Sequence, residues 1–354
     1  MENIIIYRLG SLGDTVVALP CFHKIAQRFP TAKRILLTNI PISTKAAPLE
    51  AILGGSGLVD RAIAYPVGTR SLAKLWQVSR EIRGTNARTL IYLMPARGRV
   101  AAIRDFIFFR LSGVRRIIGL PVTADLQNNR VDRTTGELEP ECERLVRTLA
   151  VLGPIDLAAR EAWDLALTEQ EKSIGRQCVE EFGGISFFAI NMGGKAPEKD
   201  WGADRWTELL AVLADNYAEY GLLILGAAED SKRAQRVSRK WPNRVIDACG
   251  RLSPRESAAA LRFARIFIGH DSGNLHLAAA SDVPCIGLFG GLNMPKKWHP
   301  YGKGHHIIHR MEGISAITVE EVAKAVSTVL SRSSVKTVEE TLSICSPNHT
   351  DVIS

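Results

Sequence analysis

Hydrophobic and polar positions alternate along the chain in blocks that predict strands and helices in turn. Short apolar runs, such as 3–7 and 89–93, indicate buried strands, whereas stretches with apolar residues at helical spacing, such as 15–29 and 99–111, indicate helices. Pro20 is expected to kink the first of these helices or to lie near its first turn. Strand, loop and helix in alternation are typical of parallel βα units, so we predict an α/β fold.

This pattern restarts in the second half of the chain. A polar, turn-rich segment at 123–143 is expected to be a surface loop, and the charged stretch at 158–171 is the best candidate for a linker. Later strands are predicted at 187–191, 221–225, 266–269 and 285–289, and a final helix at 319–330. We therefore predict two domains, residues 1–165 and 166–330. The Ser- and Thr-rich tail, 331–354, is expected to be partly disordered.

Composition supports a globular protein with two cores. Of the 354 residues, 46% are apolar and 23% are charged. The apolar runs fall short of the roughly 18 residues that a membrane span needs, and the first residues do not resemble a signal peptide, so we expect a cytoplasmic protein. The six cysteines form no CxxC pair, which argues against a zinc knuckle or a disulfide framework.

The net charge of +8 comes entirely from the residues up to Asp164, because acidic and basic residues balance in the remainder. A basic first half indicates an anionic partner, either a phosphorylated acceptor, an acidic membrane surface or nucleic acid. Solubility alone explains the bias equally well.

Several common motifs are missing from the sequence. There is no GxGxxG after a strand, no GxxxxGK[ST], no GxSxG and no HExxH. These absences disfavour a dinucleotide-dependent oxidoreductase, a P-loop enzyme, an α/β-hydrolase and a zinc protease.

The first informative motif is RLGSLGD, at 8–14, where a strand end feeds a loop with two glycines. Gly10 and Gly13 allow a tight turn and the close approach of a ligand. Asp14 either caps the following helix or acts as a general base at the carboxyl end of the sheet, and the residues alone favour the cap.

The second motif is HDSGNLHLAAA, at 270–280, which follows a strand and opens a helix of small residues. Ser272 and Gly273 would present backbone N–H groups to a phosphate at the positive end of the helix dipole. His276, in the first turns, could donate to a phosphate or ribose oxygen. The alternative is a capped helix that packs closely through small residues around a core histidine.

The third motif, at 191–206, places Gly193 and Gly194 after a strand and adds two lysines, Lys195 and Lys199. Lysines of this kind can reach a diphosphate as mobile charges, although a solvated loop would look similar. Two glycine-bearing strand ends that converge on one edge of a parallel sheet favour a nucleotide diphosphate site.

A series of arginines follows the strand at 89–93, interleaved with phenylalanines. The arginines are Arg97, Arg99, Arg104, Arg110, Arg115 and Arg116. They suit phosphate recognition, but a helix with a buried Phe face and a solvated Arg face would give the same pattern. No known nucleic-acid-binding module surrounds them, so we expect no nucleic-acid partner.

Four motifs in order give the chain a resemblance to the heptosyltransferase family, glycosyltransferase family nine, from residue 3 to about residue 330. They are RLGSLGD with ALP at 18–20, KDW at 199–201, HDSGNLHLAAA, and LFG…WHPYG at 288–302. The resemblance implies a GT-B architecture of two Rossmann-like domains that face a cleft. The first domain would bind the acceptor, usually the lipopolysaccharide inner core, and the second the donor, usually ADP-heptose.

The resemblance also implies roles for individual residues. Asp14 would be the catalytic base of a single inverting displacement, and Lys199 would stabilise the departing ADP. The implied donor-binding residues are Asp271, Ser272, Gly273, His276 and Gly193, and the implied acceptor-binding residues are Gly10, Ser11, Gly13, Arg97 and Arg99. Asp271 and His276 would hold the diphosphate directly or through an ion such as Mg²⁺, and no cofactor is otherwise expected.

The sequence departs from the family at two places. Residues 93–98 read LMPARG where an acidic, glutamine-containing loop is common, and His270 stands where a small, apolar or amide residue is more usual. The first departure leaves the acceptor open. An enzyme with another nucleotide-sugar donor, or a non-catalytic nucleotide-sugar-binding protein, are the alternatives. Peripheral contact with the cytoplasmic face of the inner membrane is a further expectation.

Overall fold

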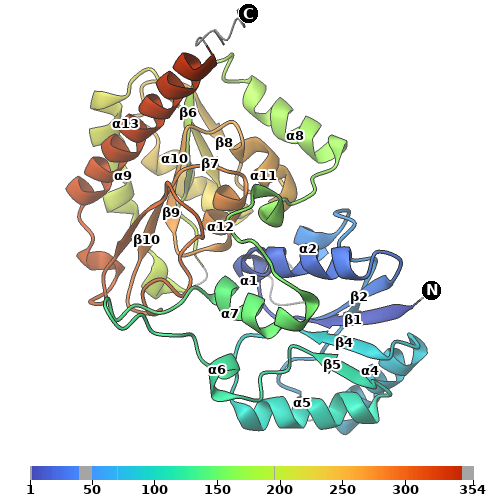
Figure 1. Cartoon of the computed structure of the whole chain (residues 1–354). Coiled ribbons are helices and arrows are strands. Elements are labelled where there is room, and N and C mark those ends of the chain that lie inside the picture. The colour runs from blue at the N-terminus through green and yellow to red at the C-terminus, as the bar shows by residue number, and fades with distance from the viewer. Residues whose placement is uncertain (1, 40–49, 70, 195, 345–354) are drawn as a thin grey trace, which may run out of the picture.

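The computed structural model describes residues 2–39, 50–69, 71–194 and 196–344, and it shows two α/β domains that meet along one side (Figure 1). Within these residues the first sheet has five parallel strands in the order β3-β2-β1-β4-β5. They are β1 (Asn3–Tyr7), β2 (Lys33–Thr38), β3 (Arg61–Ala64), β4 (Thr89–Tyr92) and β5 (Arg116–Ile118). The apolar run of β1 is buried from Ile4 to Tyr7, as a central strand covered on both faces requires.

Helices and short 3₁₀ turns connect and cover these strands. They are α1 (Leu12–Val17), α2 (Leu19–Arg28), α3 (Glu50–Leu53), α4 (Leu72–Gly84), α5 (Arg99–Leu111), α6 (Ala124–Gln127), α7 (Glu141–Thr148), η1 (Ala150–Leu152) and η2 (Arg160–Trp163). In Figure 1, α5 forms the lower edge of this domain, on the side away from the second domain.

The second sheet has six parallel strands among the described residues, in the order β11-β10-β9-β6-β7-β8. They are β6 (Phe187–Asn191), β7 (Gly221–Leu225), β8 (Val245–Asp247), β9 (Ile266–His270), β10 (Cys285–Phe289) and β11 (His306–His309). Adjacent β6 and β9 end at the same edge of the sheet, so the loops that follow them lie side by side.

The helices of this domain complete a doubly wound arrangement. They are α8 (Glu169–Glu180), α9 (Ala203–Asn216), α10 (Ser231–Val237), α11 (Pro254–Leu261), α12 (Gly273–Ala280) and α13 (Val319–Ile344), with 3₁₀ turns η3 (Pro197–Lys199), η4 (Ala228–Asp230) and η5 (Ile314–Ala316). None of the helices in the described part of the chain is long and apolar enough to cross a bilayer.

The predicted α/β fold with two parallel sheets is confirmed, and several boundaries are corrected. The helix expected at 15–29 is two helices that break at Ala18, because Pro20 takes the first turn of α2, where its missing N–H costs nothing. The segment 123–143 contains α6 and the start of α7. The final helix does not end at 330 but continues to Ile344, so much of the expected tail is helical; residues 345–354 lie outside the described part.

Sequence reasoning missed the elements with weak or mixed periodicity. These are β3, α4, α8 and β11. The strand β3 has only one buried residue, Ile63, and α4 buries only Val78 and Ile82, so neither carries a clear apolar stripe. Within the stretch expected to be a linker, Thr168 caps α8 through a capping box.

A buried arginine joins the segment between the sheets to both domains. The Arg255 guanidinium pairs with Glu171, at 2.7 Å, and donates to the carbonyls of Ile52, Leu165 and Ala166. Because the side chain is almost fully buried, each of its N–H groups needs a partner. Arg255 therefore fixes the segment around residue 165 against the first domain; the domain boundary at 165–166 stays a prediction.

The contact between α8 and α11 depends on a glycine. A Cβ at Gly175 would lie 2.5 Å from Ala259 Cβ and 2.6 Å from Ala260 N, so Gly175→Ala should separate these helices. We expect a loss of about 1–3 kcal/mol in the free energy of unfolding, measured by denaturant titration. The matched control is Gly84→Ala, since a Cβ at the end of α4 meets nothing within 4 Å. Equal stabilities of the two variants would contradict the packing argument.

Candidate functional site

The two domains meet where α1 of the first lies against the N-terminus of α12 in the second (Figure 1). A Cβ at Gly273 would lie only 2.3 Å from Leu12 Cδ2, so Leu12 occupies the space that any other residue at 273 would fill. Gly13 faces His276 in the same way, at 3.1 Å from an ideal Cβ to the ring Cδ2. Two predicted glycine motifs, far apart in the sequence, therefore form one junction.

A second contact closes the domains beside this junction. The Tyr301 ring, in the WHPYG motif, stacks on Trp163 with centroids 5.6 Å apart, and the Glu141 backbone N–H donates to the carbonyl of Lys297. The apolar cluster that includes Ile4 of the first sheet also includes Leu275 of α12. The domain interface is therefore packed and apolar next to the candidate site.

Asp14 lies in α1 with its two carboxylate oxygens in different settings. Oδ2 accepts hydrogen bonds from the backbone N–H and the hydroxyl of Ser11, at 2.8 and 2.9 Å. Oδ1 accepts none from the described residues. The N-cap of α1 is Ser11 and not Asp14, so the hypothesis that Asp14 caps the helix is wrong. Asp14 is the third residue of the helix, and its carboxylate accepts a hydrogen bond from the backbone N–H of Ser11. One oxygen is fixed, and the other is available to a ligand.

The loop around Asp14 is held by Gly10 and by a buried arginine. Gly10 has a φ of +155° and lies against Asp14, where a Cβ would meet Asp14 Cβ at 2.6 Å; its N–H donates to Asn39 Oδ1. The fully buried Arg8 donates to the carbonyls of Asp14 and Leu93, which connects α1 to the end of β4. Burial lowers the pKa of Arg8, and the nearby Asp14 charge opposes that shift.

Lys199 and Asp271 form an ion pair on the other side of the junction. Lys199 Nζ lies 2.6 Å from Asp271 Oδ2, and Asn293 Nδ2 donates to the same oxygen, also at 2.6 Å. The lysine follows β6 and the aspartate follows β9, so adjacent strands bring them together. Lys199 side-chain exposure is 26%, which leaves the ammonium accessible to an anion beside the pair.

The N-terminus of α12 carries no side-chain cap. Ser272 occupies the N-cap position, but its hydroxyl donates to Asn191 Oδ1, at 3.2 Å, and not to the helix. The first N–H groups of α12, together with the helix dipole, therefore face the junction without a side-chain acceptor. A phosphate bound there would satisfy them.

His276 is buried behind Gly13, in the second turn of α12. Burial lowers the pKa of His276, while the charges of Asp271 and Asp14 act in the opposite direction. Asp14 follows Gly13, which packs on this ring, so the helix that carries Asp14 and the α12 histidine meet at the same contact. The neutral imidazole can donate one hydrogen bond to a ligand oxygen.

His270, the departure from the family pattern, has a structural role. Its Nε2 accepts hydrogen bonds from Trp201 N and Trp206 Nε1, at 3.3 and 3.2 Å, in a fully buried position. Burial lowers the pKa of His270 to about 4, so the ring is neutral and carries its proton on Nδ1. By holding Trp201, this histidine fixes the chain two residues after Lys199.

Gly193 lies in the loop after β6, the same connection that leads to Lys199. A Cβ there would meet Asp230 Oδ2 at 2.4 Å, so the glycine lets the loop after β6 pack on the loop after β7. The structure does not place Gly193 in contact with Lys199 or Asp271. Lys195 lies outside the described residues.

The two arginines expected to bind the acceptor are occupied by protein groups. Arg97 donates to Tyr7 Oη and Tyr92 Oη and pairs with the buried Asp105. Arg99 donates to the carbonyl of Val122, at 3.1 Å. Among the described residues neither arginine contacts Asp14. Arg97 instead neutralises the charge of the buried Asp105. Acceptor binding by either arginine stays a prediction.

A metal ion finds few protein ligands at the junction. Among the described residues, no three His, Cys, Asp or Glu side chains gather where an ion could bind. Asp271 offers Oδ1, because Lys199 and Asn293 occupy Oδ2. A Mg²⁺ ion would fit only if diphosphate oxygens and water supplied most of its ligands, which is common for Mg²⁺.

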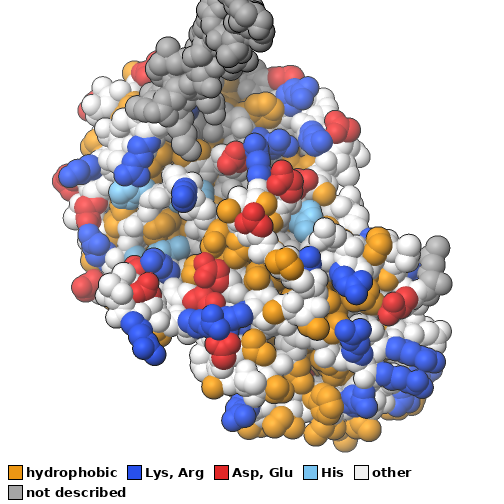
Figure 2. Space-filling model, viewed as in Figure 1, with side chains coloured by type: hydrophobic (Ala, Val, Ile, Leu, Met, Phe, Trp, Pro, Cys, Tyr) orange, Lys and Arg blue, Asp and Glu red, His pale blue; other side chains and the backbone are white. Residues whose placement is uncertain are grey.

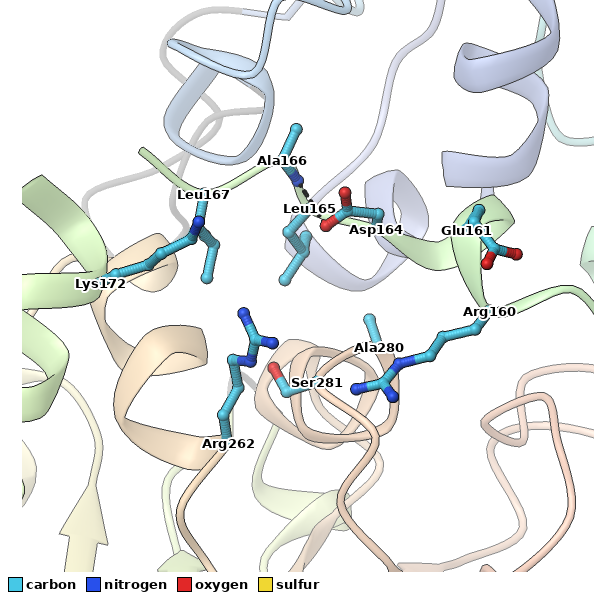
Figure 3. Close-up of a pocket in the computed structure, with 10 residues that line it drawn as sticks. All are labelled: Arg160, Glu161, Asp164, Leu165, Ala166, Leu167, Lys172, Arg262, Ala280 and Ser281. Carbon is cyan, nitrogen blue, oxygen red and sulfur yellow. Dashed lines mark hydrogen bonds between the residues drawn. The ribbon is translucent and has the colours of Figure 1, made fainter. Parts of the chain in front are cut away.

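A cavity of about 430 Å³ lies at the opposite end of α12, beside the segment that joins the domains (Figure 3). Its lining includes Arg160, Asp164, Lys172, Arg262 and Ser281. Acidic and basic groups are mixed here, and none of the predicted site residues lines it. We place the candidate site at the junction and not in this cavity.

Sequence reasoning missed the polar residues that support the site. Asn293 and Asn39 each bind a site residue from another loop, and Asn191, which accepts a hydrogen bond from Ser272, is the last residue of β6. The WHPYG and LFG motifs pointed to the region of Asn293 without indicating which side chain would reach Asp271. Arg8 was part of a predicted motif, yet its burial beneath Asp14 has no signature in the sequence.

Comparison with known proteins supports the resemblance to the heptosyltransferase family. The family model described as glycosyltransferase family 9 (heptosyltransferase) matches residues 120–324. The chain is also similar to lipopolysaccharide heptosyltransferase 1 of Escherichia coli (strain K12), with 29% identity over 110 residues. That match spans 31% of this chain and 33% of the relative, about a third of the length of each.

Two solved structures resemble nearly the whole chain. A glycosyl transferase family 9 protein from Veillonella parvula DSM 2008 has a TM-score of 0.69 and 20% identity, covering 94% of this chain and 98% of that one. The E. coli heptosyltransferase WaaC, in a structure with ADP, has a TM-score of 0.64 and 18% identity, covering 93% and 100%. The two parallel-sheet domains and these neighbours identify a GT-B architecture.

The buried His270 predicts how stability depends on pH. Its folded-state pKa of about 4 lies below the ordinary value of about 6.5, so the stabilisation is complete above pH 6.5 and is lost as the pH falls toward 4. Denaturant titrations should show that protonation of His270 lowers the free energy of unfolding by on the order of 3 kcal/mol as the pH falls through that window. In His270→Gln the free energy of unfolding should depend less steeply on pH in this window, by an amount equivalent to at most one proton. Identical pH dependence in the two proteins would contradict the assignment.

Proposed function

The chain belongs to glycosyltransferase family 9 (heptosyltransferase), and from that premise we propose that it transfers a sugar from a nucleotide diphosphate donor to an acceptor hydroxyl, with inversion. The observation that carries this proposal is the contact of α1 with α12. Asp14 lies in the first of these helices with one oxygen held by Ser11, the second begins without a side-chain cap, and Lys199 pairs with Asp271 just before it. Such a displacement needs a base that takes the proton of the attacking hydroxyl and a separate site that stabilises the negative charge of the leaving group.

The chemical step begins at Asp14. Oδ1 takes the proton of the acceptor hydroxyl as the hydroxyl oxygen attacks the anomeric carbon from the face opposite the leaving group. Ser11 holds Oδ2, so the carboxylate keeps its direction during the transfer. The buried Arg8 donates to the backbone carbonyl of Asp14, which fixes the turn that carries the carboxylate.

The leaving group is stabilised at the other side of the junction. As the bond from the anomeric carbon to the diphosphate oxygen breaks, the bonding electrons stay on the diphosphate. Lys199 and the first N–H groups of α12 lie where that charge develops, and His276 can donate to the same group. Asp271 holds the ammonium of Lys199 in place before the donor arrives, which lowers the cost of ordering it.

The finer assignment is ADP-heptose as donor and the lipopolysaccharide inner core, or a related envelope glycan, as acceptor. The names of the relatives support it, including one solved with ADP. The basic first domain suits an acidic, phosphorylated acceptor. A donor with a different sugar keeps the same chemistry, and a non-catalytic nucleotide-sugar-binding protein would have no use for a free carboxylate oxygen at Asp14.

The role of Asp14 predicts that Asp14→Asn loses turnover but keeps donor affinity. The amide can still accept the Ser11 hydrogen bonds but cannot take a proton, so kcat should fall by about 10²–10⁴ in a sugar-transfer assay. The affinity for ADP, measured by calorimetry, should stay within about twofold. Glu81→Gln, on exposed α4, is the matched control and should retain full activity. Full activity of the Asp14→Asn protein would mean that another group is the base, and a wild-type protein that binds ADP but transfers no sugar would favour the non-catalytic binder.

The role of Lys199 predicts that Lys199→Met weakens nucleotide diphosphate binding. Removing a charged hydrogen-bond donor should cost about 1.5–3 kcal/mol, or about 10- to 100-fold in the dissociation constant of ADP. Lys240→Met, an exposed lysine in the same domain, is the control.

Thermal stabilisation by ADP, UDP, GDP and NAD, each with and without Mg²⁺, measures both affinity and selectivity. At a hundredfold excess over the dissociation constant, the wild-type chain should gain about 2.7 kcal/mol. A stronger response to UDP or GDP would overturn the ADP assignment and keep the transferase. Stabilisation by ADP that depends on Mg²⁺ would support an ion at Asp271. Equal stabilisation by ADP with and without Mg²⁺ would mean that no ion takes part in binding.

A further inference from the structure

The helix α5 (Arg99–Leu111) is apolar on both of its faces. Its inner face packs on the first sheet through Ala102 and Phe109, both buried. Its outer face exposes four large apolar side chains: Val100 (83%), Ile103 (55%), Ile107 (51%) and Leu111 (68%). A surface helix ordinarily carries polar residues on its outer face, so this stripe indicates a partner that covers it.

The exposed residues form one continuous stripe. At about 100° of rotation per residue, Val100, Ile103, Ile107 and Leu111 fall within a sector of about 80° that runs the length of the helix. Phe106, 42% exposed, lies outside this sector, beyond Arg99 and Arg110. Figure 2 shows hydrophobic side chains gathered along the lower edge of the first domain, where Figure 1 places α5.

Arginines flank the stripe on both sides. By the same geometry, Arg104 lies on one flank, and Arg99 and Arg110 lie on the other. Asp105 is the single acidic residue in α5, and it is buried on the inner face, where it pairs with Arg97 and Arg104. The outer face of α5 is therefore apolar along its centre and purely cationic at its margins.

We propose that the outer face of α5 docks on a lipid bilayer that carries anionic headgroups. An apolar stripe along one helix can enter the boundary between headgroups and acyl chains, while flanking arginines bind lipid phosphates. A second copy of this chain is the less favourable occupant, because it would set arginine margins against arginine margins. The surface follows from exposure and charge alone, so it does not depend on the proposed function.

The neighbouring helix α4 adds residues of the same kind. Ser79 in α4 accepts a hydrogen bond from Ser112, at the end of α5, so the two helices run together at their C-termini. Trp76 is 60% exposed, and the Arg80 guanidinium lies 4.7 Å from its ring centroid. Trp and Arg are residues that favour the interfacial region of bilayers.

Docking through α5 would also orient the candidate site. The helix begins directly after the loop that follows β4, and β4 pairs with β1, whose own following loop carries Asp14. If the proposed function holds, docking through α5 would fix the direction in which the sheet edge that carries Asp14 faces relative to the membrane.

Vesicle co-sedimentation of the full chain tests the proposal. Vesicles of phosphatidylcholine with 30% phosphatidylglycerol should bind the wild-type protein at least tenfold more strongly than pure phosphatidylcholine vesicles, as about fivefold per engaged arginine implies. Ile103→Glu/Ile107→Glu should lose at least tenfold of that binding. Val212→Glu/Phe263→Glu, two exposed apolar residues of the second domain, is the matched control and should bind as wild type does.

The two components of the surface can be separated. Arg104→Gln/Arg110→Gln should lower binding to the anionic vesicles about 25-fold, and high salt should have the same effect on the wild-type protein. Thermal denaturation confirms that each variant is folded, and transfer to a water-soluble acceptor should be unchanged. Equal binding to neutral vesicles, unchanged binding by Ile103→Glu/Ile107→Glu, or a wild-type dimer that this variant dissociates would each overturn the proposal.

Discussion

Leu12 lies in the space above Gly273, and the arrangement of the whole site depends on that contact. It brings the first turn of α1 against the first turn of α12, which come from different domains and from sequence positions more than 250 residues apart. Gly13 and His276 extend the contact. Because no side chain intervenes at Gly273, the carboxylate of Asp14 and the uncapped helix N-terminus share one junction. Arg255 and Tyr301 make further contacts between the domains.

The charges at this junction are arranged before any ligand binds. Ser11 fixes one oxygen of Asp14, and Asp271 with Asn293 holds Lys199. Such preorganisation matters because groups that are already oriented need not be reoriented when charge develops in the reaction. The neutral, buried His270 contributes to this preorganisation without contacting Lys199, because it accepts a hydrogen bond from the backbone of Trp201, two residues further along the chain. The proposed transferase activity uses each of these groups, and the proposed membrane surface on α5 uses none of them.

Much of the fold and part of the site could be predicted from the sequence. The central strands are continuous apolar runs, so β1, β6, β7 and β10 were predicted with their observed bounds. Lys199, Ser272 and Gly273 were predicted to lie near one another because parallel strands end at one sheet edge, and the family resemblance added Asp271. Helix α4 and strand β3 could not be predicted, since few of their residues are buried. The partners of site residues, such as Asn293, depend on loop conformations, which a local pattern does not specify.

The most direct test of this account is a crystal structure of the full chain with ADP. The account predicts that the terminal phosphate accepts hydrogen bonds from the first N–H groups of α12 and lies within about 3 Å of Lys199 Nζ, on the side that faces Asp14. ADP bound instead in the cavity lined by Arg160 and Arg262, or at any place that leaves the Gly273 N–H without a phosphate, would contradict it.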